Sequence, residues 1–239
     1  MNSNGTAERI DDPSQRNAVK VAGFMFLAAF IVPTLNWAFV QSKFIVAENI
    51  LSTAKNIMAN ELLFRIGITI ELFMSAGLII LAAALYAVLK KVNKNFALLA
   101  LSLKLVEAAI VAAIIVVSFI ALLILGGGAN LTAFTPEQLQ VLVGFLLNEH
   151  TVIYSIPMVF LGIDMMIFSY LFFKSEYIPK ALAGFGIVSF ALIFIHALMY
   201  ILAPEYAALP VNQMIFWAPS GIFELIIGIW LLTKGIKVE

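Results

Sequence analysis

Six long apolar blocks constrain this chain more than any other feature of its sequence. They cover approximately residues 20–41, 61–89, 95–125, 150–173, 179–203 and 213–233. About 20 apolar residues of α-helix cross the hydrocarbon core of a bilayer. The composition agrees, because 63% of residues are hydrophobic and only 12% are charged, whereas soluble domains have about 25% charged residues. We therefore expect an all-α integral membrane protein with six transmembrane helices.

The basic residues outside these blocks predict how the chain is oriented. Ten lie on one side of the predicted membrane: Arg9, Arg16, Lys20, Lys90, Lys91, Lys94, Lys174, Lys180, Lys234 and Lys237. The other side has only Lys43 and Lys55. Basic residues collect on the cytoplasmic side, so we expect both termini in the cytoplasm. Residues 1–19 are then a polar cytoplasmic tail and 20–236 a single six-helix domain, whose first block is too long for a signal-peptide core.

Two segments on the opposite, outer side predict short helices. Apolar residues recur at helical spacing across residues 50–58, a pattern typical of a helix that lies in the membrane interface. Thr135, Pro136 and Gln138 match an N-cap, a proline at the first helical position and the glutamine of a capping box. A second outer helix should therefore begin at Pro136.

A weak internal repeat and two prolines also bear on the architecture. Gly77, Gly162 and Gly221 each precede a cytoplasmic lysine by twelve or thirteen residues. This spacing is compatible with three tandem helical hairpins, although helices with basic ends share it without any repeat. Pro157 and Pro219 lie in the outer halves of their blocks, where a lost backbone hydrogen bond permits a kink. The outer half should be less regular than the inner half.

Three ionisable residues fall near the middle of the predicted membrane. Lys104, Asp164 and Glu224 each lie ten residues from a cytoplasmic lysine, which places all three about 15 Å deep. A charge at this depth costs about 2.5–3.5 kcal/mol unless it is compensated. One lysine facing two carboxylates leaves an acid in excess, so one acid should hold a proton or meet an incoming cation. The alternative is a salt bridge that only fixes helix packing.

Further polar groups are predicted in a tier closer to the outer surface. Counting from the cytoplasmic lysines places Glu107 about 20 Å deep, His196 about 24 Å and Glu71 about 28 Å. His196 is the nearest of these to Glu71 in depth, so we expect it as the partner of that carboxylate. For His196 itself, a hydrogen-bonded interior histidine is a simpler interpretation than a ligand.

Three ionisable residues are predicted at the outer rim: Arg65, Glu149 and His150. Glu61 and Arg65 are four residues apart, which favours an ion pair on one helix face. The simplest interpretation of this group is interfacial, with side chains that extend towards water.

Several classes of function have no support in the sequence. The net charge is zero, so no nucleic-acid partner is indicated. His150 and His196, the two histidines, differ in predicted depth by about 12 Å, too much for two axial ligands of one haem. Without cysteine and with two distant histidines, a zinc site is not indicated, nor is there a nucleotide-binding or nucleophile motif. We expect no cofactor and no metal, and an enzymatic role is disfavoured.

Four stretches of the chain resemble a known family. They read ELLFRIGITIEL, LYAVLKKVNKNFALLALSLKLVEA, LFFKSEYIPKALAG and FELIIGIWLLTKG. In order and spacing they are similar to an uncharacterised bacterial multi-pass membrane family, domain of unknown function 4386. The resemblance implies a helical protein of the bacterial inner, or cytoplasmic, membrane, and it carries no assigned activity.

Three functional hypotheses follow, from different classes. The first is binding or translocation of a small cationic or proton-coupled solute. The residues that would act in it are Lys104, Asp164 and Glu224 at the midplane, with Glu107, His196 and Glu71 as an outer path. The second is a non-catalytic accessory or structural subunit, whose buried salt bridges fix helix packing or dock a protein partner. The third, an intramembrane lipid-modifying enzyme, is the weakest. The lipid bilayer is the one partner common to all three.

Overall fold

The computed structural model describes residues 13–46, 49–126, 134–148 and 150–237, without the side chains of residues 50, 148, 150 and 151. Within these ranges the regular structure is entirely helical. Six helices are long and apolar enough to cross a membrane. The predicted all-α fold with six spans is therefore confirmed.

The six long helices match the predicted blocks closely. They are α1 Pro13–Phe39, α3 Glu61–Leu89, α4 Lys94–Leu125, α6 His150–Ser175, α7 Lys180–Leu202 and α9 Pro210–Thr233. The first begins seven residues earlier than its apolar block. Its first turns pack on the end of α3, because the Gln15 side chain donates a hydrogen bond to the Val88 carbonyl (3.4 Å) and accepts one from Lys91 Nζ (3.1 Å).

Four short helices lie in the described parts of the connections between the long ones. They are η1 Gln41–Lys43, a 3₁₀ turn, and the α-helices α2 Ile50–Ala59, α5 Pro136–Asn148 and α8 Pro204–Ala207. Helices α2 and α5 are the two predicted outer helices. The capping box of α5 is formed as expected, since the Thr135 amide donates to Gln138 Oε1 (2.9 Å) and the Gln138 amide donates to Thr135 Oγ1 (3.3 Å).

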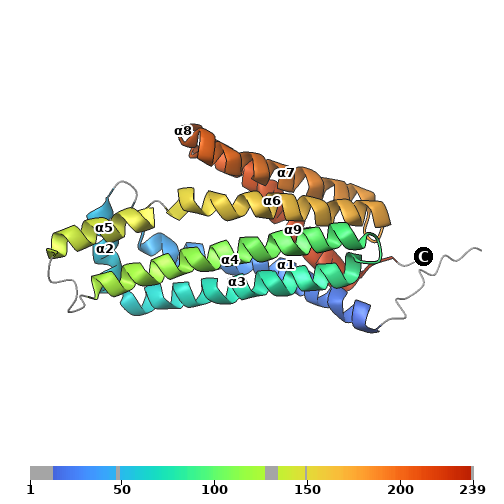
Figure 1. The fold of residues 1–239 in the computed structure, drawn as a ribbon, viewed down its shortest axis with the longest axis horizontal. Helices are drawn as coiled ribbons and strands as arrows, with labels where there is room; N and C mark the ends of the chain where they lie inside the picture. The colour runs from blue at the N-terminus through green and yellow to red at the C-terminus, as the bar shows by residue number, and fades with distance from the viewer. Residues whose placement is uncertain (1–12, 47–48, 127–133, 149, 238–239) are drawn as a thin grey trace, which may run out of the picture.

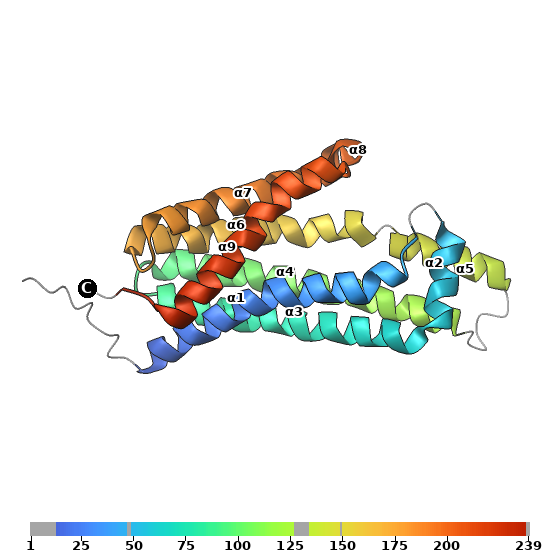
Figure 2. The same ribbon diagram turned by 180° about the vertical axis from the view of Figure 1, so that it is seen from behind.

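The long helices form a ring in which each packs against its neighbour in sequence. Helix α1 packs on α3, α3 on α4, α4 on α6, α6 on α7 and α7 on α9, and α9 returns to α1. Helix α1 begins and α9 ends at the same end of the bundle (Figures 1 and 2). The two helices of each predicted hairpin pack together: α1 with α3, α4 with α6 and α7 with α9. Helices of different hairpins also pack together, so the arrangement is one continuous ring.

The ring is packed differently at its two ends. One apolar cluster draws buried residues from all six long helices. A second cluster, at the end near α2 and α5, contains buried residues from the α1–α5 part of the chain and none from α7 or α9 within the described ranges. At that end α7, α8 and α9 lean away from α6 (Figures 1 and 2). We call the half near α2 and α5 the outer half, after its predicted side of the membrane, and the other the inner half. The outer half therefore separates into two groups of helices, while the inner half is closed.

Glycines allow close contact between neighbouring helices in the ring. A Cβ atom on Gly162 of α6 would lie 2.7 Å from Cβ and 2.9 Å from Cα of Phe194 in α7. A Cβ on Gly23 of α1 would lie 3.0 Å from the Gly228 carbonyl oxygen of α9. Small residues of this kind let helix backbones approach closely in membranes, so Gly162 fixes the α6–α7 contact and Gly23 the α1–α9 contact.

Candidate functional site

Three charged side chains meet in the interior of the ring, and we call Lys104, Glu107 and Asp164 the central charge cluster. Lys104 Nζ donates a hydrogen bond to Glu107 Oε2 at 2.7 Å and lies 3.0 Å from Asp164 Oδ1. Their exposed fractions are 0% for Lys104, 2% for Glu107 and 0% for Asp164. Lys104 and Asp164, which were predicted at the same depth, therefore do lie together, across the contact between α4 and α6.

The buried face of α4 explains how a lysine fits there. Lys104 and Glu107 are three residues apart and share this face. Ala97, Ala100 and Ala108 share it too, and each is at most 2% exposed. Their small side chains leave room for the long Lys104 stem between α4 and its neighbours, and the ammonium end reaches α6.

The cluster contains more negative than positive charge. One ammonium faces two carboxylates. Asp164 Oδ1 lies 3.0 Å from that ammonium, whereas Asp164 Oδ2 is buried without a hydrogen-bond donor among the described residues. Charges removed from water destabilise a protein unless they are fully compensated. With both acids ionised, the cluster carries one uncompensated negative charge, which a proton or a small cation would neutralise.

Glu224 lies near this cluster on α9 but does not join it. Its carboxyl is close enough to interact electrostatically with Lys104 and Glu107, without an ion pair or hydrogen bond to either in the described structure. Glu224 shares a helix face with Ser220 and Ile227, both of which are buried. Protein atoms enclose its carboxyl, although the residue as a whole is only half-buried. Glu224 is therefore an enclosed acid without an ion pair in the described structure.

Glu71 lies in a separate polar site nearer the outer end. Its Oε1 accepts hydrogen bonds from Gln41 Nε2 (2.9 Å) and from Asn36 Nδ2 (3.4 Å). Asn36 lies in the last turns of α1 and is 4% exposed. A Cβ on Gly67 would lie only 3.0 Å from Val40 Cγ1, so the glycine one turn before Glu71 lets the end of α1 reach α3. We call Asn36, Gln41 and Glu71 the Glu71 amide site.

The expected pairing of Glu71 with His196 is wrong. His196 is 1% exposed, and its Nδ1 accepts a hydrogen bond from the Trp217 indole N–H at 2.8 Å. Since an indole nitrogen can only donate, the imidazole proton is on Nε2, which donates to the Ala207 carbonyl at 3.1 Å. The Phe216 ring stacks on the imidazole at 5.0 Å. His196 thus joins α7, α8 and α9, on the far side of the ring from Glu71.

Replacement of Trp217 by Phe should loosen this outer corner. The change leaves His196 Nδ1 without a donor in a buried position, which costs about 1–3 kcal/mol. We expect faster amide hydrogen exchange in α8 and the adjoining ends of α7 and α9, with little change in α1–α4. Trp37→Phe is the matched control, because Trp37 is 54% exposed. Equal exchange in both variants would contradict this assignment.

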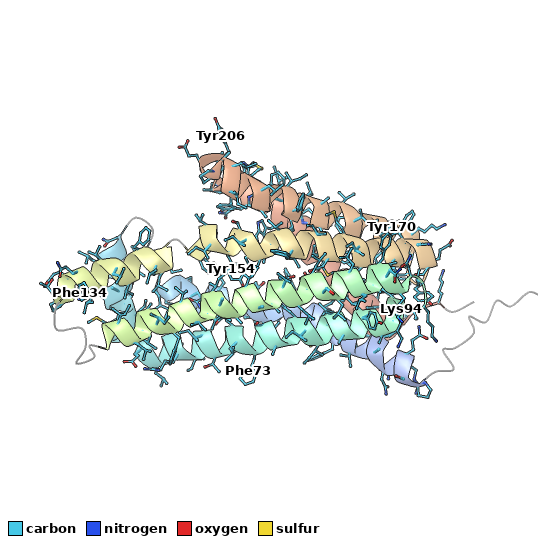
Figure 3. The ribbon with its side chains drawn as sticks, viewed as in Figure 1. Phe73, Lys94, Phe134, Tyr154, Tyr170 and Tyr206 are labelled. Carbon is cyan, nitrogen blue, oxygen red and sulfur yellow. The ribbon has the colours of Figure 1, made fainter. Side chains whose placement is uncertain are left out.

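Tyr154 of α6 connects the two polar regions and was not anticipated from the sequence. It packs against both apolar clusters, and the carboxylates of Glu71 and Glu107 both act electrostatically on its phenol. Figure 3 places Tyr154 near the middle of the molecule, far from Phe134 at the outer end and Lys94 at the inner end. Tyr154 was missed because only acids, basic residues and histidines were placed by depth. Asn36 and Gln41 were missed because their amides carry no charge.

The outer-rim residues are only partly described. Arg65 forms an exposed ion pair with Glu61, with Nη2 and Oε1 2.7 Å apart, as their spacing predicts. Glu149 and the side chain of His150 lie outside the described residues. The rim therefore offers one exposed pair, which contributes little to stability.

Two of the surface hollows among the described residues are lined by residues outside the central charge cluster. One, of about 270 Å³, is lined by the apolar residues Phe96, Leu99, Met166, Ile167, Tyr170 and Ile187 of α4, α6 and α7. The other lies where α2 meets α3. In the part of the chain that the structure describes, no three His, Asp or Glu side chains group closely enough to hold a metal ion.

Comparison with known proteins agrees with the helical architecture. The family model described as "Domain of unknown function (DUF4386)" matches residues 21–235, which include all six spans except the first turns of α1. No curated protein and no solved structure gave a match. Because this match covers most of the chain, the protein belongs to the DUF4386 family, and it is a multi-pass helical membrane protein.

Proposed function

We propose that this protein binds, and moves across the membrane, a small solute that is cationic or coupled to a proton. The observation that carries the proposal is the charge imbalance in the ring interior. Lys104 is fully buried between Glu107 and Asp164, and a third acid, Glu224, lies close by without an ion pair in the described structure. An uncompensated ionisable group at membrane depth marks an ion, proton or substrate site more often than a packing feature.

Each residue has a distinct place in the proposal. Lys104 supplies the fixed positive charge, and Asp164 presents a carboxylate oxygen without a hydrogen-bond donor. Glu224 is the acid without an ion pair in the described structure, and it is less buried than Asp164 and Glu107. A cationic group or a proton that binds between Glu224 and the central charge cluster would balance the excess negative charge. We expect access from the end near α2 and α5, where the buried apolar cluster contains no residue of α7 or α9 among those described.

Neutralising Glu224 tests this proposal. Purified protein in vesicles that contain a pH-sensitive dye should carry protons under an imposed potassium diffusion potential, with or without methylammonium as a small cationic probe. Glu224→Gln should lower that flux about tenfold or more, because a loss of about 1.4 kcal/mol in binding free energy corresponds to a factor of ten. Asp164→Asn should act in the same direction.

Glu205→Gln is the matched control for this experiment, because Glu205 is an exposed acid on α8. It removes the same charge and should keep the flux of the original protein. Equal flux through the Glu224 and Glu205 variants would contradict the role of Glu224. Flux no greater than in empty vesicles, for both protons and methylammonium, would contradict transport of these ions.

A purely structural role is the second candidate, and one observation favours it. The contacts of Lys104 with Glu107 (2.7 Å) and Asp164 (3.0 Å) connect α4 to α6 through groups that are at most 2% exposed. Such a pair would fix how the two helices pack, whether or not a solute binds. A subunit that only supports a protein partner would need the cluster for folding and show no flux at all.

A further inference from the structure

The Glu71 amide site contains a carboxyl group that has no basic partner in the described structure. Its hydrogen-bond donors are the neutral amides of Asn36 and Gln41. Two basic side chains of the neighbouring helices are engaged elsewhere, because Arg65 pairs with Glu61 and Lys104 with the central charge cluster. A partly buried carboxylate with only neutral partners is costly unless its charge is neutralised.

The amide of Asn36 supplies an independent observation. Its Nδ2 donates to Glu71 Oε1, while its Oδ1 is buried and has no hydrogen-bond donor. A carboxylate has no hydrogen to offer this oxygen, but a protonated carboxyl group has one O–H donor. A carboxylic acid and an amide can then form two hydrogen bonds side by side, one in each direction. The missing donor of Asn36 is therefore what a proton on Glu71 would provide.

We propose that Glu71 is a proton-binding site, in which the protonated carboxyl group donates to Asn36 Oδ1 and accepts from Asn36 Nδ2 and Gln41 Nε2. The proton comes from water at the outer side and forms an O–H bond on the second carboxyl oxygen. No electron is transferred, and the site changes from one negative charge to none. This site is distinct from the central charge cluster, and the proposal does not depend on solute transport.

Other charged and titratable groups surround the site. On the elements packed around it these are Lys43, Lys55, Glu61, Arg65, Lys104, Glu107 and Tyr154. Lys43 and Lys55 are exposed, and neither forms an ion pair with Glu71 in the described structure. Tyr154 is acted on by both Glu71 and Glu107, so a proton on Glu71 removes one of the two negative charges near that phenol.

Proton binding at Glu71 would connect the end of α1 to α3. Asn36 lies in the last turns of α1 and Gln41 in η1, where the helix changes to a 3₁₀ turn. With Glu71 protonated, all of the amide's hydrogen-bonding atoms have partners and the two helices are joined. When the proton leaves, Asn36 Oδ1 lies beside a negative carboxylate without a donor, and this junction weakens.

Glu71→Gln mimics the protonated state and tests the proposal directly. The new side-chain amide can donate to Asn36 Oδ1 while its oxygen still accepts from Gln41. We therefore expect the variant in detergent to melt at the same temperature as the original protein or several degrees higher in neutral buffer. The original protein should gain stability as the buffer is acidified, because a proton that binds the folded state stabilises it. The variant should lack that part of the gain.

Infrared spectroscopy detects the proton itself. The difference between the original protein and Glu71→Gln in neutral buffer should contain the carbonyl band of a protonated carboxyl group, with the usual shift in heavy water. Glu61→Gln is the matched control, since it removes a carboxylate of the same helix that is exposed and ion-paired. Its difference spectrum should show a carboxylate band and no protonated-carboxyl band.

Three results would overturn the proposal. The first is a Glu71→Gln difference spectrum without the protonated-carboxyl band. The second is a Glu71→Gln protein that fails to fold or melts below the Glu61→Gln control. The third is stabilisation of the original protein, but not of Glu71→Gln, when sodium chloride replaces choline chloride at fixed pH, because that would identify a metal cation as the ligand. None of these depends on solute flux, so the outcome is separate from that of the Glu224 experiment.

Discussion

Lys104→Met should nearly abolish the folded protein in the membrane. The substitution removes the only positive charge in contact with Glu107 and Asp164 in the described structure and leaves both acids buried. Loss of one partner from a buried ion pair costs about 3–5 kcal/mol, a large fraction of the stability of a typical domain. The yield of monodisperse protein after detergent extraction, and its apparent melting temperature, measure the effect.

The matched control for this variant is Lys174→Met. Lys174 lies in the last turn of α6 and is exposed, so its loss should leave both yield and melting temperature close to those of the original protein. If the two lysine variants behaved alike, the central charge cluster would not have the energetic role that its burial indicates.

A triple variant separates structure from function at the same site. Lys104→Met, Glu107→Met and Asp164→Leu together replace the cluster by apolar groups of similar size, and such replacements of buried ion pairs are often neutral or stabilising. We expect the triple variant to recover the yield that Lys104→Met loses. If it also carries protons as the original protein does, the cluster only fixes packing, and the proposed function fails at this site.

Gly162→Ala should force α6 and α7 apart. The added methyl group would lie 2.7 Å from Cβ, 2.9 Å from Cα and 3.0 Å from the amide nitrogen of Phe194. These atoms belong to or adjoin the backbone, so no side-chain rotation relieves the clash. Overpacking of this kind costs about 1–3 kcal/mol, and we expect a clearly lower melting temperature in detergent.

Gly184→Ala is the control for the glycine experiment. Gly184 lies in α7, and the nearest atom to an added Cβ there is in the Phe173 ring at 3.9 Å, an ordinary contact. This variant should be as stable as the original protein or slightly more stable, because alanine favours the helix over glycine by about 0.5–1 kcal/mol. A stable Gly162→Ala protein would mean that the two helices do not need their close approach.

The features that were predicted correctly depend on local sequence. The span from Glu61 to Leu89 is set by its own apolar content, which any segment of that length must satisfy in lipid. The capping box of α5 is likewise a contact between Thr135 and Gln138, three residues apart. Depth along a helix is also local, since it follows from the rise per residue, and it correctly predicted that Lys104 and Asp164 lie at the same level.

The features that were missed depend on the order and rotation of the helices. Glu71 and His196 have similar predicted depths, but α1 lies beside α3 whereas His196 faces α8 and α9. Depth gives the height of a residue and not the direction in which it points around the ring. Asn36 was missed for a different reason, because a neutral amide has no charge to mark it and its importance arises only beside Glu71.

The ring of helices also has a topological consequence. Each neighbouring pair is consecutive in the chain and joined by a covalent connection at one end, except for α1 and α9, which are the first and last helices. These two are held together only by non-covalent packing, including the close approach of Gly23 and Gly228. Separation of α1 from α9 would therefore stretch no loop, whereas the connection between the two helices of every other neighbouring pair limits how far they can separate.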